Sequence, residues 1–160
     1  MHDAAPDQDK SESLDTPDPP EQLDRKDYLY VHFWHDEDWV KYTERQRDRG
    51  QISPRLGFLT DEEGNPVPES RIKMFMSTAK QAWSELYHLR LDPSLWTKKT
   101  LKAASYLAYI MKMKFDEFRY CDGDWKVEHF AIIKYPDWCR DARDSGRLTC
   151  TSDISFSHCV

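Results

Sequence analysis

The feature that most constrains the fold is a helical repeat of apolar residues in the middle of the chain. Between positions 69 and 89 the apolar side chains recur at intervals of three or four residues: Ile72, Phe75, Ala79, Ala82, Trp83 and Leu86. This spacing places them on one face of an α-helix. The other side of that helix carries polar residues: Lys73, Ser77, Lys80, Ser84 and His88. The pattern predicts an amphipathic helix over 69–89 whose apolar face packs against other parts of the chain.

The segment before this helix predicts an extended arm and a first helix. Residues 28–34 read YLYVHFW, which has high strand propensity and can form either a short strand or an arm packed along the domain. The acids at 36–38 suit the positive end of a helix dipole, and Gly50 suits the exit from a helix. We therefore favour a helix over 36–48 that is preceded by an extended arm.

The connection between these two helices is rich in glycine and proline. Within residues 56–68, the stretch FLTDEEGNPV can close as a small β-hairpin through Glu63 and Gly64. A short hairpin is therefore added to an otherwise helical prediction.

A central helix is predicted over 97–115, after a break at LDPSLW in which Pro93 follows a capping aspartate. Its apolar residues again repeat at intervals of three and four. The residues assigned to its buried stripe are Leu101, Ala104, Ala108, Met111, Phe115 and Phe118. We expect most of the core to surround this helix.

The last helical region is predicted to be divided at Pro136. Proline disfavours helical geometry in the preceding residue, so a helix that begins near Trp125 should end before Pro136, which then opens a short final helix. The sequence thus predicts an all-α domain of four or five helices. The six tryptophans are irregularly spaced and are assigned to core packing. The central core is expected to contain Trp83, Leu101, Phe115, Trp125 and Phe130.

The ends of the chain differ from this central region. Residues 1–26 contain many acids and four prolines but no aromatic residue, so they cannot bury enough apolar surface to offset the cost of ordering. After Gly146 the helical periodicity stops. We predict a disordered acidic tail over 1–26, a helical domain over 27–146 and a loose C-terminal tail over 147–160.

Charge is distributed unevenly along the chain. Residues 1–26 hold eight acids and three bases, a net charge of −5, whereas residues 71–147 hold fifteen bases and ten acids, a net charge of +5. Such asymmetry is typical of a chain that meets an acidic partner, including nucleic acid, or of an acidic tail that folds back on its own domain.

Several features bear on the compartment. No window approaches the roughly 18 consecutive apolar residues of a spanning helix, and the first 26 residues lack the basic start and apolar segment of a secretory signal. The cysteines form no C-x-x-C pair, and we expect Cys121, Cys139, Cys150 and Cys159 to be free thiols. We therefore expect an intracellular protein, nuclear or cytoplasmic, with no membrane partner.

One helix face suggests a binding surface. Four lysines and a tyrosine recur on the side of the predicted central helix opposite its buried stripe: Lys98, Lys99, Lys102, Tyr109 and Lys112. Lysines on one face can lie along a phosphate backbone. The face lacks the arginine, asparagine and glutamine side chains that read base edges best, so any contact with nucleic acid would be weakly specific. An ordinary solvent-exposed helix face is the alternative interpretation.

The residue types that bind metals or catalyse reactions form no recognisable pattern. The candidate metal ligands match no compact zinc spacing: Cys121, His129, Cys139, Cys150, His158 and Cys159. A catalytic set of Cys121, His129 and a nearby aspartate, Asp122 or Asp124, requires an assumed geometry. A partly buried histidine with satisfied hydrogen bonds is the better interpretation of His129. We predict no metal site, no cofactor and no catalytic residue.

The order of short stretches from FLTDEEGNPV through DGDWKVEHFAIIKYPDW resembles a group of uncharacterised fungal proteins, over about residues 56–138. The resemblance lies in the overall succession of segments and contains no catalytic motif. It implies a eukaryotic, non-secreted protein and no particular activity.

Two functions follow from these observations. The abundance of aromatic residues and the absence of a catalytic pattern favour a non-enzymatic helical module that binds another protein. The alternative is a nucleic-acid-associated module that uses the lysine-rich face, with the acidic tail competing for that surface.

Overall fold

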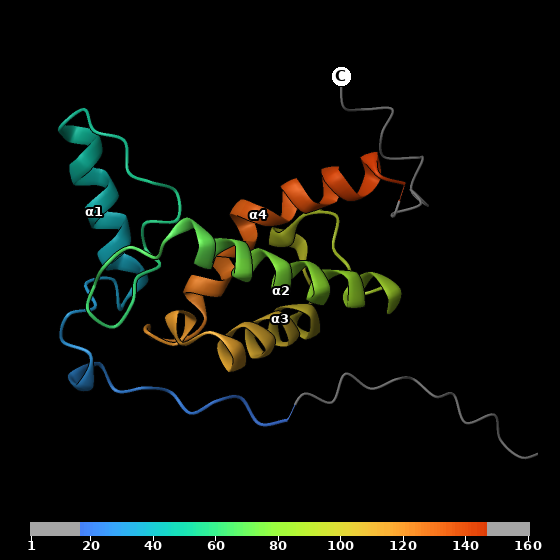
Figure 1. Ribbon diagram of the computed structural model, residues 1–160, viewed down its shortest axis with the longest axis horizontal. Helices are drawn as coiled ribbons and strands as arrows, with labels where there is room; N and C mark the ends of the chain where they lie inside the picture. Colours follow the sequence, from blue (N-terminus) through green and yellow to red (C-terminus); the bar gives the residue numbers. More distant parts are fainter. Residues whose placement is uncertain (1–16, 147–160) are drawn as a thin grey trace, which may run out of the picture.

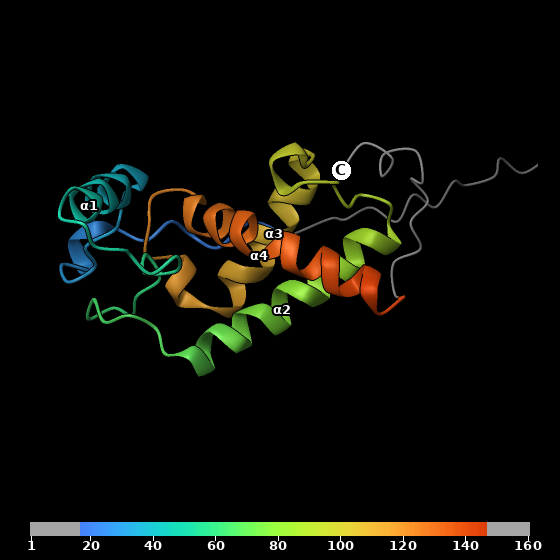
Figure 2. The same cartoon turned by 90° about the horizontal axis from the view of Figure 1, so that it is seen from above.

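A computed structural model describes residues 17–146, and within this range the fold is all-α, as the sequence predicts. Three short 3₁₀ turns accompany four α-helices. In chain order the elements are η1 (Arg25–Asp27), α1 (Asp36–Asp48), α2 (Glu69–His88), η2 (Trp96–Lys98), α3 (Leu101–Lys114), η3 (Asp116–Phe118) and α4 (Trp125–Asp144). Helix α3 packs against both α2 and α4. Figures 1 and 2 show these three helices grouped together, with α1 at one end of the body.

The first two helices lie where the sequence predicts them. Helix α1 spans the predicted residues, and the Asp38 carboxylate at its start accepts a hydrogen bond from the His35 backbone N–H at 3.0 Å. This contact uses the backbone of His35, so it stabilises the start of the helix without requiring the serine or aspartate that usually caps it. Helix α2 ends at His88, one residue before the predicted end, and its buried residues are Phe75, Thr78, Ala79, Ala82, Trp83 and Leu86.

Helix α3 begins later than predicted, and the assignment of Leu101 to the core is wrong. The Thr100 hydroxyl accepts a hydrogen bond from the Ala103 backbone N–H at 3.1 Å and caps the helix there. Leu101 is thus the first helical residue, at an end that no other element covers, and it is 84% exposed. The residues that α3 buries are Ala103, Leu107, Ala108 and Met111.

Helix α4 is continuous through Pro136, so the predicted division at this residue is wrong. Proline lacks the N–H that would bond to the Ile132 carbonyl. Both residues are exposed, and water can reach that carbonyl. Phe130 and Trp138, on either side of the proline, are both buried in the same core. Packing on both sides therefore offsets the cost of about 3 kcal/mol that an internal proline imposes on a helix.

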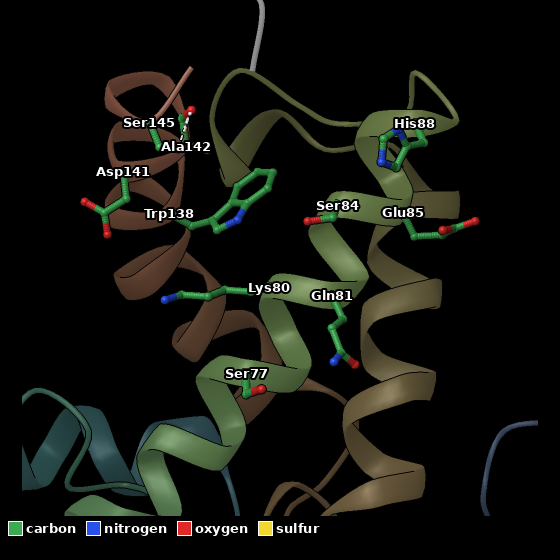
Figure 3. A pocket seen from close by; sticks show the side chains of 10 residues that line it. All are labelled: Ser77, Lys80, Gln81, Ser84, Glu85, His88, Trp138, Asp141, Ala142 and Ser145. Carbon is green, nitrogen blue, oxygen red and sulfur yellow. Dashed lines mark hydrogen bonds between the residues drawn. The ribbon is translucent and has the colours of Figure 1, made fainter. Parts of the chain in front are cut away.

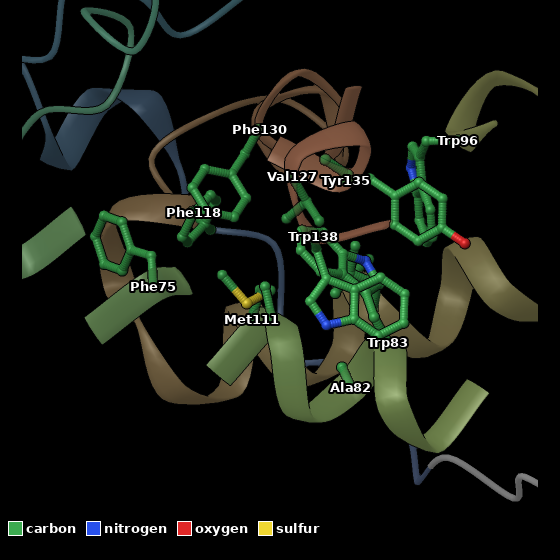
Figure 4. Close-up of a cluster of buried hydrophobic side chains, with 14 of the residues drawn as sticks. Phe75, Ala82, Trp83, Trp96, Met111, Phe118, Val127, Phe130, Tyr135 and Trp138 are labelled. Atoms are coloured by element: carbon green, nitrogen blue, oxygen red, sulfur yellow. The ribbon is translucent and has the colours of Figure 1, made fainter. Parts of the chain in front are cut away.

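The core is built mainly from aromatic side chains, as Figure 4 shows. Phe75 of α2 meets the Phe115 ring at a centroid distance of 4.7 Å and the Phe118 ring at 4.9 Å. Trp83 meets Tyr135 of α4 at 5.3 Å. The assignment of the tryptophans to the core is confirmed for Trp34, Trp39, Trp83, Trp96 and Trp138. Trp125 is partly buried and packs against the same core.

The segment before α1 is an extended arm without a strand, as favoured from the sequence. Its Trp34 carbonyl accepts hydrogen bonds from the Asp122 backbone N–H at 2.9 Å and from the Trp125 indole N–H at 3.0 Å. Contacts with the domain begin inside the predicted tail of residues 1–26, because the Gln22 side-chain amide donates a hydrogen bond to the Cys121 carbonyl at 2.7 Å. The remainder of that tail, residues 1–16, and the predicted C-terminal tail, 147–160, lie outside the described residues.

The predicted hairpin is present as a turn with a single antiparallel bridge between Thr60 and Pro66, without strands. The Asp61 backbone N–H donates to the Asn65 carbonyl at 2.9 Å inside the turn. Gly64 has a φ of +83°, and a Cβ atom there would lie 2.3 Å from the Tyr30 carbonyl oxygen. Glycine is required at this position for both reasons.

Candidate functional site

Two lysines of the lysine-rich face predicted from the sequence form ion pairs with residues at the start of α4. Lys99 Nζ lies 2.7 Å from the Glu128 carboxylate, and its side chain is 19% exposed. Lys112 Nζ lies 2.8 Å from Asp124, and its side chain is 11% exposed. Lys99, at the end of η2, thus pairs with a residue of α4, and Lys112 of α3 pairs with the residue that precedes α4.

The other residues of that face are not aligned on one helix. Lys98 belongs to η2, whereas Lys102 lies in the first turn of α3. Both are exposed, and Tyr109 is partly buried. The structure therefore leaves Lys98 and Lys102 as exposed bases without a continuous basic stripe. Binding of nucleic acid by this face stays a prediction.

The structure gives Cys121 and His129, which the sequence analysis considered as a catalytic set with Asp122 or Asp124, other partners. His129 Nε2 lies 3.1 Å from the Asp36 carboxylate of α1, and the imidazole packs edge-on against the Phe58 ring. The Cys121 thiol is buried and donates to the Phe118 carbonyl at 3.3 Å. Burial raises the pKa of this thiol, which disfavours the reactive thiolate. His129 therefore has a structural role in docking α1.

Within residues 17–146, no three potential metal ligands come together. Cys121 and Cys139 are free thiols. The other candidate ligands, Cys150, His158 and Cys159, lie outside the described residues.

An open groove of about 730 Å³ lies between α2 and α4, shown in Figure 3. Ser77, Lys80, Gln81, Ser84, Glu85 and His88 of α2 line it, together with Trp138, Asp141, Ala142 and the adjacent Ser145 from the α4 side. Four of the α2 residues, Ser77, Lys80, Ser84 and His88, were identified from the sequence as part of the polar side of the helix, whereas Gln81 and Glu85 were not. Their partners on α4 were missed because the predicted division at Pro136 gave no account of how the second half of this helix packs.

Trp138 provides the apolar surface of the groove. Its ring packs against Trp83 at a centroid distance of 5.8 Å and against Tyr135 at 5.6 Å. Trp138 is 7% exposed, and the neighbouring Ala142 is 5% exposed. The floor of the groove is thus rigid, aromatic and shallow, with polar residues on both sides.

Two charged residues of the groove, Lys80 of α2 and Asp141 of α4, form no ion pair among residues 17–146. By contrast, Asp137 and Arg140, one turn away, pair at 3.2 Å. Figure 3 shows Lys80 extending from α2 toward α4 below the Trp138 ring. Glu85 and Asp141 point outward at the two edges. Their charges are therefore available to a bound molecule.

The groove does not contain an activated nucleophile. Ser84 and His88 lie one turn apart on α2, but no hydrogen bond joins them in the described structure, and no carboxylate orients the imidazole. Nucleophilic catalysis requires such a chain of contacts. The arrangement is suited to binding through an apolar floor and fixed charges.

The described residues form a small all-α domain with an open groove between two helices. No protein-family model, curated protein or solved structure matches the chain. The resemblance to uncharacterised fungal proteins stays a prediction. In the described residues, no helix combines the length and the apolar character needed to cross a bilayer.

Proposed function

We propose that this protein is a non-enzymatic interaction module that holds a segment of a partner protein in the groove between α2 and α4. The observation that carries the proposal is the combination of Trp138 at the floor with unpaired Lys80 and Asp141 beside it. Tryptophan is among the residues most enriched at energetically important contacts between proteins. Unpaired charges at the rim select complementary partners and increase association rates.

The groove also has suitable dimensions for such a role. Its volume is about 730 Å³. The groove is open to solvent, whereas an enclosed pocket would favour a small molecule. Free thiols at Cys121 and Cys139 support the further proposal of an intracellular location, nuclear or cytoplasmic.

The proposal is tested by selecting random peptides against the full chain by phage display and measuring the affinity of the enriched peptides. Ser84→Arg places a long side chain in the groove and should weaken binding by at least about tenfold, or 1.4 kcal/mol. Ser105→Arg adds the same side chain on an exposed face of α3 and serves as the matched control. The control should bind within about twofold of the original chain.

Two results contradict the proposal. One is the failure of the selection to enrich any peptide. The other is binding that Ser84→Arg and Ser105→Arg reduce to the same extent, which would place the contact outside the groove.

A second candidate function is weakly specific binding of nucleic acid by Lys98 and Lys102, the two exposed lysines of the predicted face. It is the less supported candidate, because Lys99 and Lys112 already pair with carboxylates of the same protein. Its test is the affinity for mixed-sequence duplex DNA and RNA over a salt series, with Lys98→Glu and Lys102→Glu as variants. A steep fall of affinity with salt that both variants abolish would support it.

A further inference from the structure

A small apolar cluster lies apart from the main core of the described residues. Its buried members are Val31, Trp34 and Tyr120, and Leu23 and Tyr28 pack against it. Only Tyr120 comes from outside the arm that precedes α1, which is blue in Figure 1. The Tyr28 ring meets the Tyr120 ring at a centroid distance of 4.9 Å and the Trp34 ring at 6.0 Å. These arm residues therefore pack on one another and on a single tyrosine, separately from the aromatic core of the helices.

Three hydrogen bonds tie the start of this arm to the segment before α4. The Gln22 side chain donates to the Cys121 carbonyl at 2.7 Å and accepts from the Gly123 backbone N–H at 3.3 Å. The Arg119 guanidinium donates to the Glu21 carbonyl at 3.0 Å. The bonds to Gly123 and from Arg119 lie at exposed positions, where water competes for the same groups. These contacts hold the arm in place at a small net gain.

The closed arrangement leaves one polar group unsatisfied. Arg119 Nε is buried and has no hydrogen-bond partner among residues 17–146, although the other guanidinium nitrogens contact Glu21 and Asp116. A buried donor without an acceptor costs free energy, and that cost is removed when water reaches the group. Hydration of Arg119 therefore favours an open arm.

The arm is anchored separately at its end next to α1. Phe33 packs on the main core and meets the Trp39 ring at a centroid distance of 5.0 Å. Before this anchor, the Tyr30 carbonyl lies beside Gly64, which has no side chain to hold it. The start of the arm can therefore move away while Phe33 keeps its place in the core.

We propose that residues 21–31 form a strap that opens as a unit and uncovers Arg119 and Tyr120 while the four α-helices stay folded. Segments with few buried apolar contacts and exposed hydrogen bonds open at a lower free energy than the core of a domain. Residues 21–31 combine these features, because their apolar contacts form a cluster separate from the core that joins the helices.

Amide hydrogen exchange of the ¹⁵N-labelled full chain measures this opening. The Val31 backbone N–H donates to the Tyr28 carbonyl at 3.2 Å within the strap, and Leu107 of α3 is buried in the main core. In urea below the unfolding transition, exchange at Val31 should rise slowly because opening the strap exposes little surface, whereas exchange at Leu107 should rise steeply. Parallel slopes at the two amides would overturn the proposal, because the strap would then open only with the whole domain.

Two variants test the strap and the main core separately. Gln22→Ala removes two of the three hydrogen bonds and should increase exchange at Val31 about tenfold. Val127→Ala, in the main core, should increase exchange at Leu107 at least about tenfold. The same variant should leave Val31 within about twofold of the original chain. Gln51→Ala, at an exposed site, is the matched control for Gln22→Ala and should leave Val31 unchanged within the same limit.

Two results with these variants would overturn the proposal. One is an unchanged exchange rate at Val31 in Gln22→Ala, which would show that the two ends of the strap do not open together. The other is an exchange rate at Val31 that rises with that of Leu107 in Val127→Ala, which would join the strap to the main core.

Nitration of Tyr120 by tetranitromethane tests whether opening uncovers the surface beneath the strap. Mass spectrometry of the resulting peptides assigns the product to Tyr120. Nitration should rise about tenfold in Gln22→Ala, by the same factor as exchange at Val31, and stay within about twofold in Gln51→Ala. Faster exchange at Val31 with no change in nitration would contradict the proposal, because Tyr120 would then stay covered when the strap opens.

Discussion

Replacing Lys126 by methionine should stabilise the protein, because this lysine is buried without a hydrogen-bond partner. Its side chain is 0% exposed, and its Nζ finds no acceptor among the described residues. The amine lies over the Trp125 ring, whose centroid is 5.6 Å from Nζ. Methionine keeps the length and the apolar stem of the side chain and removes the amine that requires hydration.

The magnitude follows from the pKa of this amine. Burial lowers the pKa of Lys126 from 10.5 to about 8. At 1.36 kcal/mol per pKa unit, the charged amine costs the folded state about 3 kcal/mol at pH 7. Loss of the contact with the Trp125 ring offsets about 1 kcal/mol of the gain. We predict that Lys126→Met raises the free energy of unfolding by about 2 kcal/mol at pH 7.

The pH dependence gives the prediction its sharpest form. Because the folded pKa lies below the unfolded one, the unfolded state binds more protons between about pH 8 and pH 10.5. The penalty is complete below about pH 8 and disappears as the pH rises through this window. The difference between the original chain and Lys126→Met should therefore fall by about 3 kcal/mol between pH 7 and pH 10.5.

The assay is urea unfolding of both full chains at pH 7 and at pH 10.5, followed by tryptophan fluorescence. Lys102→Met, at an exposed site, is the control and should lie within about 0.5 kcal/mol of the original chain at both pH values. A destabilised Lys126→Met protein at pH 7, or a difference that does not change with pH, would refute the reasoning and show that the amine has a partner.

Three further changes are predicted, each measured by urea unfolding of the full chain. Glu117→Ala should destabilise the protein by about 2 kcal/mol, because it removes both carboxylate contacts of Arg71, at 2.6 and 3.1 Å, while the partly exposed Arg71 can be rehydrated; a change below about 0.5 kcal/mol would contradict this. Gly64→Ala should cost more than about 1 kcal/mol, because the added Cβ would lie 2.3 Å from the Tyr30 carbonyl oxygen, and an unchanged midpoint would argue against that contact. Pro136→Ala should stabilise α4 by about 2 kcal/mol by restoring one hydrogen bond, less the lost rigidity of the unfolded chain, so a destabilised variant would show that the proline is needed.

The parts of the fold that are determined by residues close together in the sequence could be predicted from it. The bounds of α1 and most of α2 follow from apolar spacing and from residues at the helix ends. The failures at Leu101 and Pro136 have a common cause. In both places a local preference competes with packing against distant elements, which no spacing rule describes.

The binding surfaces were harder to predict because they depend on contacts between segments far apart in the chain. The partner of Lys99 is Glu128, so a lysine that seems exposed in the pattern of one helix is neutralised by another. The groove likewise requires the crossing of α2 with the second half of α4. Ser84 and Trp138 could each be assigned to a face from the sequence, but no local signal indicated that those faces meet.

The most direct test of the central claim is the indole N–H spectrum of the ¹⁵N-labelled full chain during titration with a peptide selected for binding. The Trp138 resonance should shift and saturate with the binding isotherm, because this ring forms the floor of the groove. The Trp39 resonance, from a buried ring on α1, should not move. Saturable binding that leaves Trp138 unchanged would contradict the assignment of the groove as the binding site.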